Sequence, residues 1–325
     1  METSYTIVVP DIEQLARLCG TNDSNLHLIE KFLGVPIYTR GNELSVESSD
    51  PDIMNRFRHV IDRVLDEMTE SRDDDPNLVT SVITRLIPPE DNVEPDEAFF
   101  SAACIRIPGS VKSVYPKSYN QAELIQSMRH NSVVLCTGPA GSGKTFLAVA
   151  EALNQLLSGN VSRLVLTRPV VEAGESLGFL PGDFEQKISP YLKPLFDAIE
   201  YLLPRGMPEK LTEDGAIEIA PLAYMRGRTL NNSILILDEA QNTTREQMKL
   251  FLTRMGEGSK AFVTGDITQI DLPARIPSGL VHATRVLQNI DGIKIMQMCG
   301  SDIVRNPLVR KIVQANENDE EKREE

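Results

Sequence analysis

The sequence contains no tryptophan, only four cysteines and four histidines in 325 residues, and no long apolar run. The cysteines lie far apart and form no C-x-x-C pair, which disfavours a zinc site; two disulfides are possible in number, but reduced thiols are favoured in a chain without an export signal. The first residues lack the basic and apolar segments of a signal peptide, and no apolar run approaches the roughly 20 residues that cross a bilayer. We therefore expect a cytoplasmic protein with reduced thiols and no membrane association.

Positive charge is scarce overall, because the net charge is −14, but it is unevenly distributed. Residues 1–111 carry 9 basic against 21 acidic side chains, and residues 312–325 carry 2 against 6. Residues 112–311 are balanced, with 22 basic against 20 acidic side chains. The acidic ends disfavour a polyanion as partner there, whereas the middle can hold local basic sites for phosphate groups.

The first 69 residues show the element order β-α-α-β-β-α of a KH-type module. The expected elements are a strand at 5–9, helices at 12–20 and 26–33, strands at 35–40 and 43–47, and a helix near 53–65. We expect residues 21–24 to cap the second helix and either Asp50 or Asp52 to cap the last one. A KH module would hold single-stranded RNA at a Gly-x-x-Gly loop. Here that loop reads Gly-Thr-Asn-Asp, so the interpretation we favour is a KH-like fold that contacts proteins.

Residues 70–98 are rich in Asp, Glu and Pro and are predicted to be an acidic linker with a short helix near 78–87. From residue 99 to 315, short apolar runs alternate with helical stretches, which predicts a three-layer α/β domain around a parallel sheet. The expected strands are 133–136, 164–167, 234–237, 261–264 and 293–298. Residues 316–325 are predicted to be a disordered charged tail.

The segment from Gly138 to Thr145 matches the phosphate-binding pattern G-x-x-x-x-G-K-[ST] in full, between a strand and a helix. Its backbone N–H groups would wrap the phosphates of ATP, aided by the helix N-terminus. Lys144 would reach the β- and γ-phosphates, and the Thr145 hydroxyl would bind Mg²⁺. The candidate binding residues are Gly138, Pro139, Ala140, Gly141, Ser142, Gly143, Lys144 and Thr145.

A second apolar strand, 234–237, ends in two carboxylates, Asp238 and Glu239. This arrangement is typical of a Walker B motif, in which Asp238 would hold the Mg²⁺ shell. Glu239 would orient and deprotonate the attacking water as a general base. The alternative is that both acids merely cap the next helix.

A third strand ends near Gly265, followed by Asp266 and, three residues on, Gln269. If this strand lies between those that carry the two Walker motifs, then Thr264, Asp266 and Gln269 can sense the γ-phosphate or position water. A Gly-Asp pair is also a common turn, so this signal depends on the Walker B motif before it.

An arginine is expected to stabilise the charge that develops during phosphoryl transfer. The candidates are Arg168, Arg226, Arg228, Arg305 and Arg310, although a single arginine is more often a solvated surface residue. We favour Arg305, because a strand-to-helix turn could direct it toward a nucleotide. About twenty residues before the phosphate loop, Gln121 could contact the adenine edge; the alternative is a helix start capped by Asn120.

Taken together, these segments resemble the PhoH-like family of bacterial ATPases, in particular its members with a KH-like N-terminal domain (the YbeZ type). The resemblance covers nearly the whole chain and is most specific in the segments 138–150, 167–190, 225–229, 237–244 and 263–269. It implies a P-loop NTPase fold that is RecA-like and similar to the first core domain of superfamily 1 helicases. It also implies an adenine-reading role for Gln121 and a sensor role for Asp266 and Gln269. Further implications are ATP and Mg²⁺ as ligands, a cytoplasmic location, RNA metabolism, and partnership with a YbeY-type endoribonuclease.

Superfamily 1 helicases close ATP between two RecA-like domains, but about 45 ordered residues remain here after Gln269, and a second α/β domain needs well over about 100. We therefore expect a homo-oligomer, a hexameric ring being one form, with an arginine acting in trans. The function favoured at this stage is an ATPase that remodels RNA or ribonucleoprotein, with helicase activity left open. The alternative is a nucleotide-dependent adaptor with little turnover. A small-molecule kinase is disfavoured, because no acceptor site or arginine-rich lid is evident.

Overall fold

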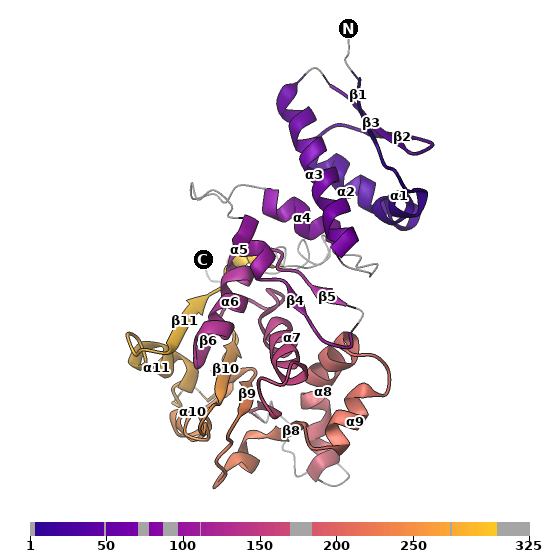
Figure 1. Ribbon diagram of the computed structural model, residues 1–325. Coiled ribbons are helices and arrows are strands. Elements are labelled where there is room, and N and C mark those ends of the chain that lie inside the picture. Colours follow the sequence, from indigo (N-terminus) through magenta and orange to yellow (C-terminus); the bar gives the residue numbers. More distant parts are fainter. Residues whose placement is uncertain are drawn as a thin grey trace, which may run out of the picture. The chain divides into compact units, whose positions relative to one another are not determined.

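The computed structural model describes residues 4–48, 50–70, 78–86, 97–110, 112–169, 184–273 and 275–303 (Figure 1). The chain falls into two compact units, and each is described by itself. The first unit comprises Met1–Gln126 with Glu200–Pro208, and the second comprises Ser127–Ile199 with Glu209–Glu325. Two of the candidate arginines, Arg305 and Arg310, lie outside the described residues. The predicted tail, 316–325, lies outside them as well.

The first unit begins with the predicted element order, β-α-α-β-β-α. The elements are β1 Ser4–Val8, α1 Ile12–Cys19, α2 Ser24–Leu33, β2 Ile37–Arg40, β3 Glu43–Glu47 and α3 Pro51–Glu70. The three strands form an antiparallel sheet in the order β1-β3-β2. The turn between β2 and β3 has Gly41 at a φ of +64°, as a two-residue hairpin requires. The order of elements is thus confirmed, while the KH assignment stays a prediction.

Helix starts in this unit differ partly from the expectation. The side chain of Asp50 accepts a hydrogen bond from the backbone N–H of Asp52 (2.9 Å) at the start of α3, so Asp50 is the capping residue of the two considered. The N-cap residue of α2 is Asp23, inside the predicted capping region, but at a left-handed φ of 56° it makes no side-chain cap. Residues 21–23 form a 3₁₀ turn (η1) ahead of the helix.

The short helix predicted within the acidic segment is present as α4, Leu78–Leu86. Its buried Leu78, Val79 and Val82 belong to the same hydrophobic core as the buried side chains of α1, α2 and α3. This part of the segment is therefore packed against the N-terminal elements. The unit continues with α5 Glu97–Ala102, β4 Ile105–Arg106 and β5 Ser113–Val114, and α6 Tyr119–His130 leads into the second unit.

The second unit contains a six-stranded parallel sheet in the order β11-β6-β10-β9-β7-β8. Its strands are β6 Val133–Thr137, β7 Arg163–Arg168, β8 Ile217–Pro221, β9 Ser233–Leu237, β10 Lys260–Gly265 and β11 Ile293–Gln297. All five predicted strands are confirmed. The sixth, β8, was not predicted, because Glu218 and Pro221 interrupt its apolar pattern; at the sheet edge both are tolerated.

Helices cover both faces of this sheet, so the unit has three layers (Figure 1). Helix α7, Lys144–Leu157, packs on one face against β7, β9 and β10. On the other face, α10 Arg245–Leu252 and α11 Gly279–Val286 form a core with alternate strand residues such as Leu235, Leu237 and Val263. This is the α/β fold of P-loop NTPases, as predicted.

The remaining helical segments are α8 Phe184–Leu202, α9 Met207–Glu213, η3 Leu222–Met225, η4 Ala240–Asn242 and η5 Gly300–Asp302. Across the described ranges, no helix is both long enough and apolar enough to cross a membrane.

The register of the sheet positions the candidate residues. Gly265 at the end of β10 is paired with Thr137 at the end of β6, and Leu237 at the end of β9 is level with Thr167 of β7. Because all strands are parallel, the residues that follow these positions gather at one edge of the sheet. A ligand site at the carboxyl ends of the strands is the usual arrangement in such folds.

Candidate functional site

The phosphate loop, residues 138–143, connects β6 to the first turn of α7, as predicted. Gly138 has a φ of 149°, and a Cβ atom there would lie 2.7 Å from the carbonyl oxygen of Met298. This position therefore accepts only glycine without displacing the chain after β11. The loop ends at Gly143, and α7 begins at Lys144.

Lys144 is turned into its own loop and is nearly buried, with 7% of its surface exposed. Its Nζ donates hydrogen bonds to the carbonyl oxygens of Gly138 (2.8 Å) and Pro139 (2.8 Å) and to the Oγ of Ser142 (3.2 Å). Burial lowers the pKa of Lys144, and this effect is opposed by Cys136 and by nearby carboxylates. The ammonium group is thus held at the base of the loop, where phosphates would enter.

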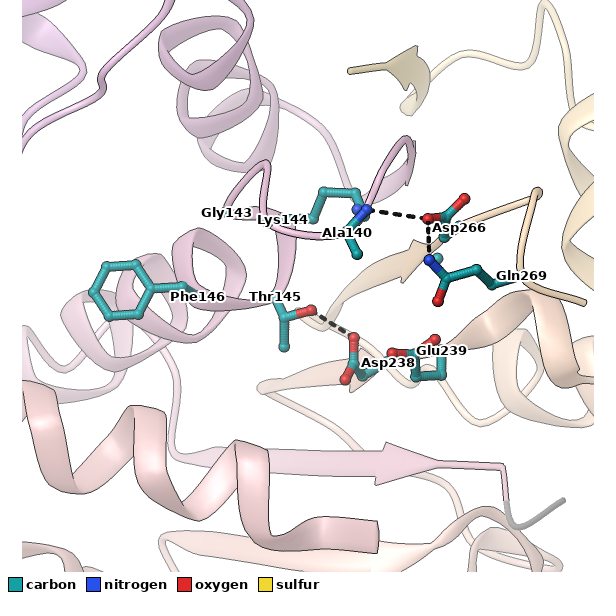
Figure 2. Close-up of a pocket in the computed structure, with 11 residues that line it drawn as sticks. Ala140, Gly143, Lys144, Thr145, Phe146, Asp238, Glu239, Asp266 and Gln269 are labelled. Atoms are coloured by element: carbon teal, nitrogen blue, oxygen red, sulfur yellow. Dashed lines mark hydrogen bonds between the residues drawn. The ribbon is translucent and has the colours of Figure 1, made fainter. Parts of the chain in front are cut away.

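Asp238 connects the loop-bearing helix to β9 and β10. Its Oδ1 accepts hydrogen bonds from the hydroxyls of Thr145 (2.6 Å) and Thr264 (2.8 Å), and the residue is 5% exposed. Figure 2 shows Thr145 and Asp238 facing each other, with Glu239 beside them. A hydroxyl and a carboxylate that meet beside a phosphate loop are oxygen ligands of the kind that Mg²⁺ prefers. The two predicted metal-binding residues therefore fit a magnesium ion.

Glu239 has a left-handed backbone conformation, with a φ of 51°. Such a conformation costs free energy for a residue with a side chain and is often retained at functional sites. Its Oε1 lies 3.1 Å from Nη2 of Arg168, and its Oε2 accepts a hydrogen bond from Nε2 of Gln241 (2.6 Å). Although Glu239 precedes η4, its side chain does not cap that helix. The capping alternative is therefore wrong for Glu239.

Asp266 and Gln269 lie on the loop after β10 and line the same pocket as Glu239. Asp266 Oδ2 accepts hydrogen bonds from the backbone N–H of Ala140 (3.0 Å) and from Nε2 of Gln269 (3.1 Å), as Figure 2 shows. Oδ1 of Asp266 accepts from the N–H and hydroxyl of Thr268 (3.0 and 2.7 Å). Of the residues predicted to sense phosphate, Asp266 thus contacts the phosphate loop directly and Gln269 contacts Asp266.

Gln241 is a residue that the sequence analysis missed. Its side-chain amide is 1% exposed. It donates to Glu239 and to the carbonyl oxygen of Gln269 (3.1 Å), and its Oε1 accepts from the N–H of Asp266 (3.0 Å). A Cβ atom on Gly265 would lie 2.7 Å from this Oε1, so glycine permits the close approach. In sequence Gln241 is one polar residue among several, and no spacing distinguishes it.

The phosphate loop and the residues at the ends of β9 and β10 line one pocket of about 270 Å³. Its lining residues are Ala140, Gly141, Gly143, Lys144, Thr145, Phe146, Asp238, Glu239, Gly265, Asp266 and Gln269. The pocket therefore brings together residues from the three strand ends that the sequence singled out.

Of the arginine candidates that the structure describes, Arg168, Arg226 and Arg228 are not among the lining. Gln121 is buried, and its Oε1 accepts a hydrogen bond from the N–H of Lys117 (2.6 Å). Its own N–H donates to Ser118 Oγ (3.2 Å), so Ser118 rather than Asn120 caps the start of α6. The adenine contact of Gln121 stays a prediction. Among the arginines, Arg228 forms a bidentate pair with Glu218, which raises the pKa of Arg228 and lowers that of Glu218.

Comparison with known proteins places the sequence among related chains. Residues 113–317 match the profile of a family described as "PhoH-like protein". The chain is 43% identical to the "PhoH-like protein" of Bacillus subtilis (strain 168) over 305 residues, which covers 93% of this chain and 94% of that one. It is 42% identical to "Protein PhoH" of Escherichia coli (strain K12) over 200 residues, 60% of this chain and 56% of that one.

Among solved structures, the Pif1 helicase from Candida albicans matches with 16% sequence identity and a TM-score of 0.29. The match covers 55% of this chain and 38% of the helicase.

The position of Gln241 predicts a measurable stability effect. Replacement of Gln241 by Leu keeps the volume but leaves the buried N–H of Asp266 without its acceptor. We expect the free energy of unfolding, measured by urea denaturation, to fall by about 1–3 kcal/mol. The exposed Gln288→Leu is the control and should change it by less than about 0.5 kcal/mol. Equal stability of Gln241→Leu and the unmodified chain would contradict the network.

Proposed function

Because the chain belongs to the PhoH-like protein family, we propose that it is a cytoplasmic ATP-binding P-loop protein that hydrolyses ATP and acts in RNA metabolism. The observation that carries this proposal is the 2.6 Å hydrogen bond between Thr145 and Asp238, next to Glu239 in a pocket that the phosphate loop lines. The reaction is hydrolysis of the bond between the β- and γ-phosphates, with water as nucleophile.

The phosphate loop would bind the nucleotide by exchanging hydrogen-bond partners. The N–H of Ala140 now donates to Asp266, and Lys144 Nζ donates to carbonyl oxygens of the loop. Phosphate oxygens would take the place of these acceptors, because they carry more charge and lie at the N-terminus of α7. Thr145 and Asp238 would hold a Mg²⁺ ion, which neutralises charge on the phosphates when it is bound.

Glu239 would act on the attacking water. Its carboxylate lines the pocket beside Asp238, and both of its oxygens are acceptors when the group is ionised. A water between Glu239 and the γ-phosphate would donate a proton to this carboxylate as its oxygen attacks phosphorus. Gln269, whose Nε2 donates a hydrogen bond to Asp266 (3.1 Å), lines the same pocket and can orient that water.

This position of Glu239 favours an enzyme over the alternative, a nucleotide-dependent adaptor. An adaptor needs phosphate and Mg²⁺ ligands, but it needs no general base in the pocket. In the function that we propose, ATP turnover remodels RNA or ribonucleoprotein together with a nuclease of the YbeY type. The N-terminal module, which we interpret as KH-like, would supply protein contacts.

The role of Glu239 is testable by Glu239→Gln, which keeps the shape and removes the base. We expect phosphate release to fall by a factor of about 10²–10⁴, while Mg·ATP still binds. Lys144→Ala is the matched variant for binding and should instead lose nucleotide affinity. For both variants, turnover is measured by phosphate release and nucleotide affinity by calorimetric titration. Normal turnover in Glu239→Gln would show that the base is another residue, and unchanged affinity in Lys144→Ala would show that the pocket is not the nucleotide site.

The two functions differ in their response to RNA. We expect single-stranded RNA to raise the rate of phosphate release by the unmodified chain, because remodelling couples turnover to the substrate. Steady-state phosphate release with and without an RNA oligonucleotide measures this. A DNA oligonucleotide of the same sequence is the control for general polyanion effects. Turnover that is negligible in all samples would favour the adaptor.

We further propose that the active form is a homo-oligomer, a hexamer being one form. The pocket lining comes from the phosphate loop, the start of α7 and the ends of β9 and β10, which lie at one edge of one sheet. A second copy could cover the nucleotide and supply an arginine in trans, for which Arg305 is the first candidate.

This assembly predicts that sedimentation in the presence of Mg·ATP shows a particle larger than the 36.1 kDa chain. Arg305→Ala should lower phosphate release, and mixing it with inactive Glu239→Gln should restore part of the rate, since each supplies what the other lacks. A monomer with full hydrolytic rate would refute the proposal.

A further inference from the structure

Arg168 is the last residue of β7 and reaches the proposed general base from a neighbouring strand. β7 pairs with β9, so Arg168 lies next to the Asp238–Glu239 segment. Its Nη2 is 3.1 Å from Oε1 of Glu239. In the strand order β6-β10-β9-β7, β7 is on the side of β9 opposite to the phosphate loop. Arg168 therefore contacts Glu239 from a strand that lies on the far side of β9 from β6 and its phosphate loop.

Gln241 holds the second oxygen of the same carboxylate, through a hydrogen bond of 2.6 Å from Nε2 to Oε2. The carboxylate of Glu239 is thus contacted at each oxygen, by an ion pair with Arg168 and by a hydrogen bond from Gln241, on a backbone that already has a left-handed φ. A carboxylate has about four lone-pair positions, so two remain for a water molecule and its proton. The contacts restrict the direction of the side chain without using up its capacity as an acceptor.

Stability alone does not account for this ion pair. The Arg168 and Glu239 side chains are 21% and 34% exposed, and pairs with this degree of solvent contact add little to folding. The physical consequence of the pair is orientation, because a guanidinium group is planar and presents its donors in a rigid fork. A misplacement of about 1 Å at a reacting group can cost a factor of about 100 in rate.

We propose that Arg168 is a positioning residue for ATP hydrolysis, which holds the Glu239 carboxylate in the direction from which it takes the proton of the attacking water. The proposal rests on the proposed function and extends it to a residue outside the pocket lining. Arg168 acts through Glu239 and within the same subunit. It is therefore distinct from an arginine that reaches the phosphates in trans.

The test compares Arg168→Met and Arg168→Lys with the unmodified chain. We expect Arg168→Met to lower kcat for phosphate release by a factor of about 10–100, while the calorimetric affinity for Mg·ATPγS changes by less than about twofold. Arg168→Lys keeps the charge but loses the fork, so it should recover part of kcat. The control is Arg163→Met, at the exposed amino end of the same strand, which should leave both quantities unchanged. Urea denaturation of each variant shows that it is folded.

A second measurement separates positioning from direct catalysis. If Arg168 acts through Glu239, then Arg168→Met in the Glu239→Gln background should change the single-turnover rate by less than about twofold, because the effects of residues that act as a unit are not additive. The full 10–100-fold loss in that background would overturn the proposal.

The proposal also fails if Arg168→Met leaves kcat unchanged or raises it, or if nucleotide affinity falls in parallel with kcat. These outcomes leave the proposed function standing, since the unmodified chain still releases phosphate in the same assay. Absence of phosphate release by the unmodified chain would instead overturn the ATPase function, and the role of Arg168 with it.

Discussion

The site depends on one hydrogen bond, from the Thr145 hydroxyl to Asp238 Oδ1. Thr145 belongs to the helix that follows β6, and Asp238 follows β9, while β10 lies between these two strands. Thr264 at the end of β10 donates to the same carboxylate oxygen. One buried oxygen therefore ties the ends of three structural segments together, and the parallel register of the sheet makes this convergence possible.

A separate chain of contacts connects the phosphate loop to Glu239. It runs from the Ala140 N–H to Asp266, from Asp266 to Gln241 through a backbone N–H, and from Gln241 to Glu239. The phosphate loop and the proposed base are thus linked through the loop after β10 rather than by direct contact. A ligand that takes the Ala140 N–H removes one hydrogen bond from the Asp266 carboxylate. Because hydrogen bonds in a buried network polarise one another, this loss also affects the bonds of Gln241 to Asp266 and Glu239.

The parts of this site that the sequence predicted are those that local patterns encode. The phosphate loop carries its own glycine spacing, and the acids after β9 follow an uninterrupted apolar strand. Gln241 and Arg168 were missed or ranked low for a physical reason, because their partners are set by strand order. Arg168 meets Glu239 only because β7 lies beside β9, and chain order, in which 70 residues separate these two positions, does not show this adjacency. β8 was missed because edge strands tolerate the charged and proline residues that conceal a strand pattern.

The structure also indicates what nucleotide binding must overcome. Lys144 donates hydrogen bonds to the carbonyl oxygens of its own loop, and Asp266 accepts from an N–H that a phosphate would use. Asp266 therefore has two opposing effects: its negative charge disfavours a phosphate nearby, and its hydrogen bond keeps the loop in shape. Since Gln269 donates to the same Oδ2 atom, its amide remains a partner for Asp266 when Ala140 turns to the phosphate. This shared acceptor makes the exchange less costly, because the Oδ2 atom of the buried carboxylate keeps one donor when the Ala140 N–H leaves it.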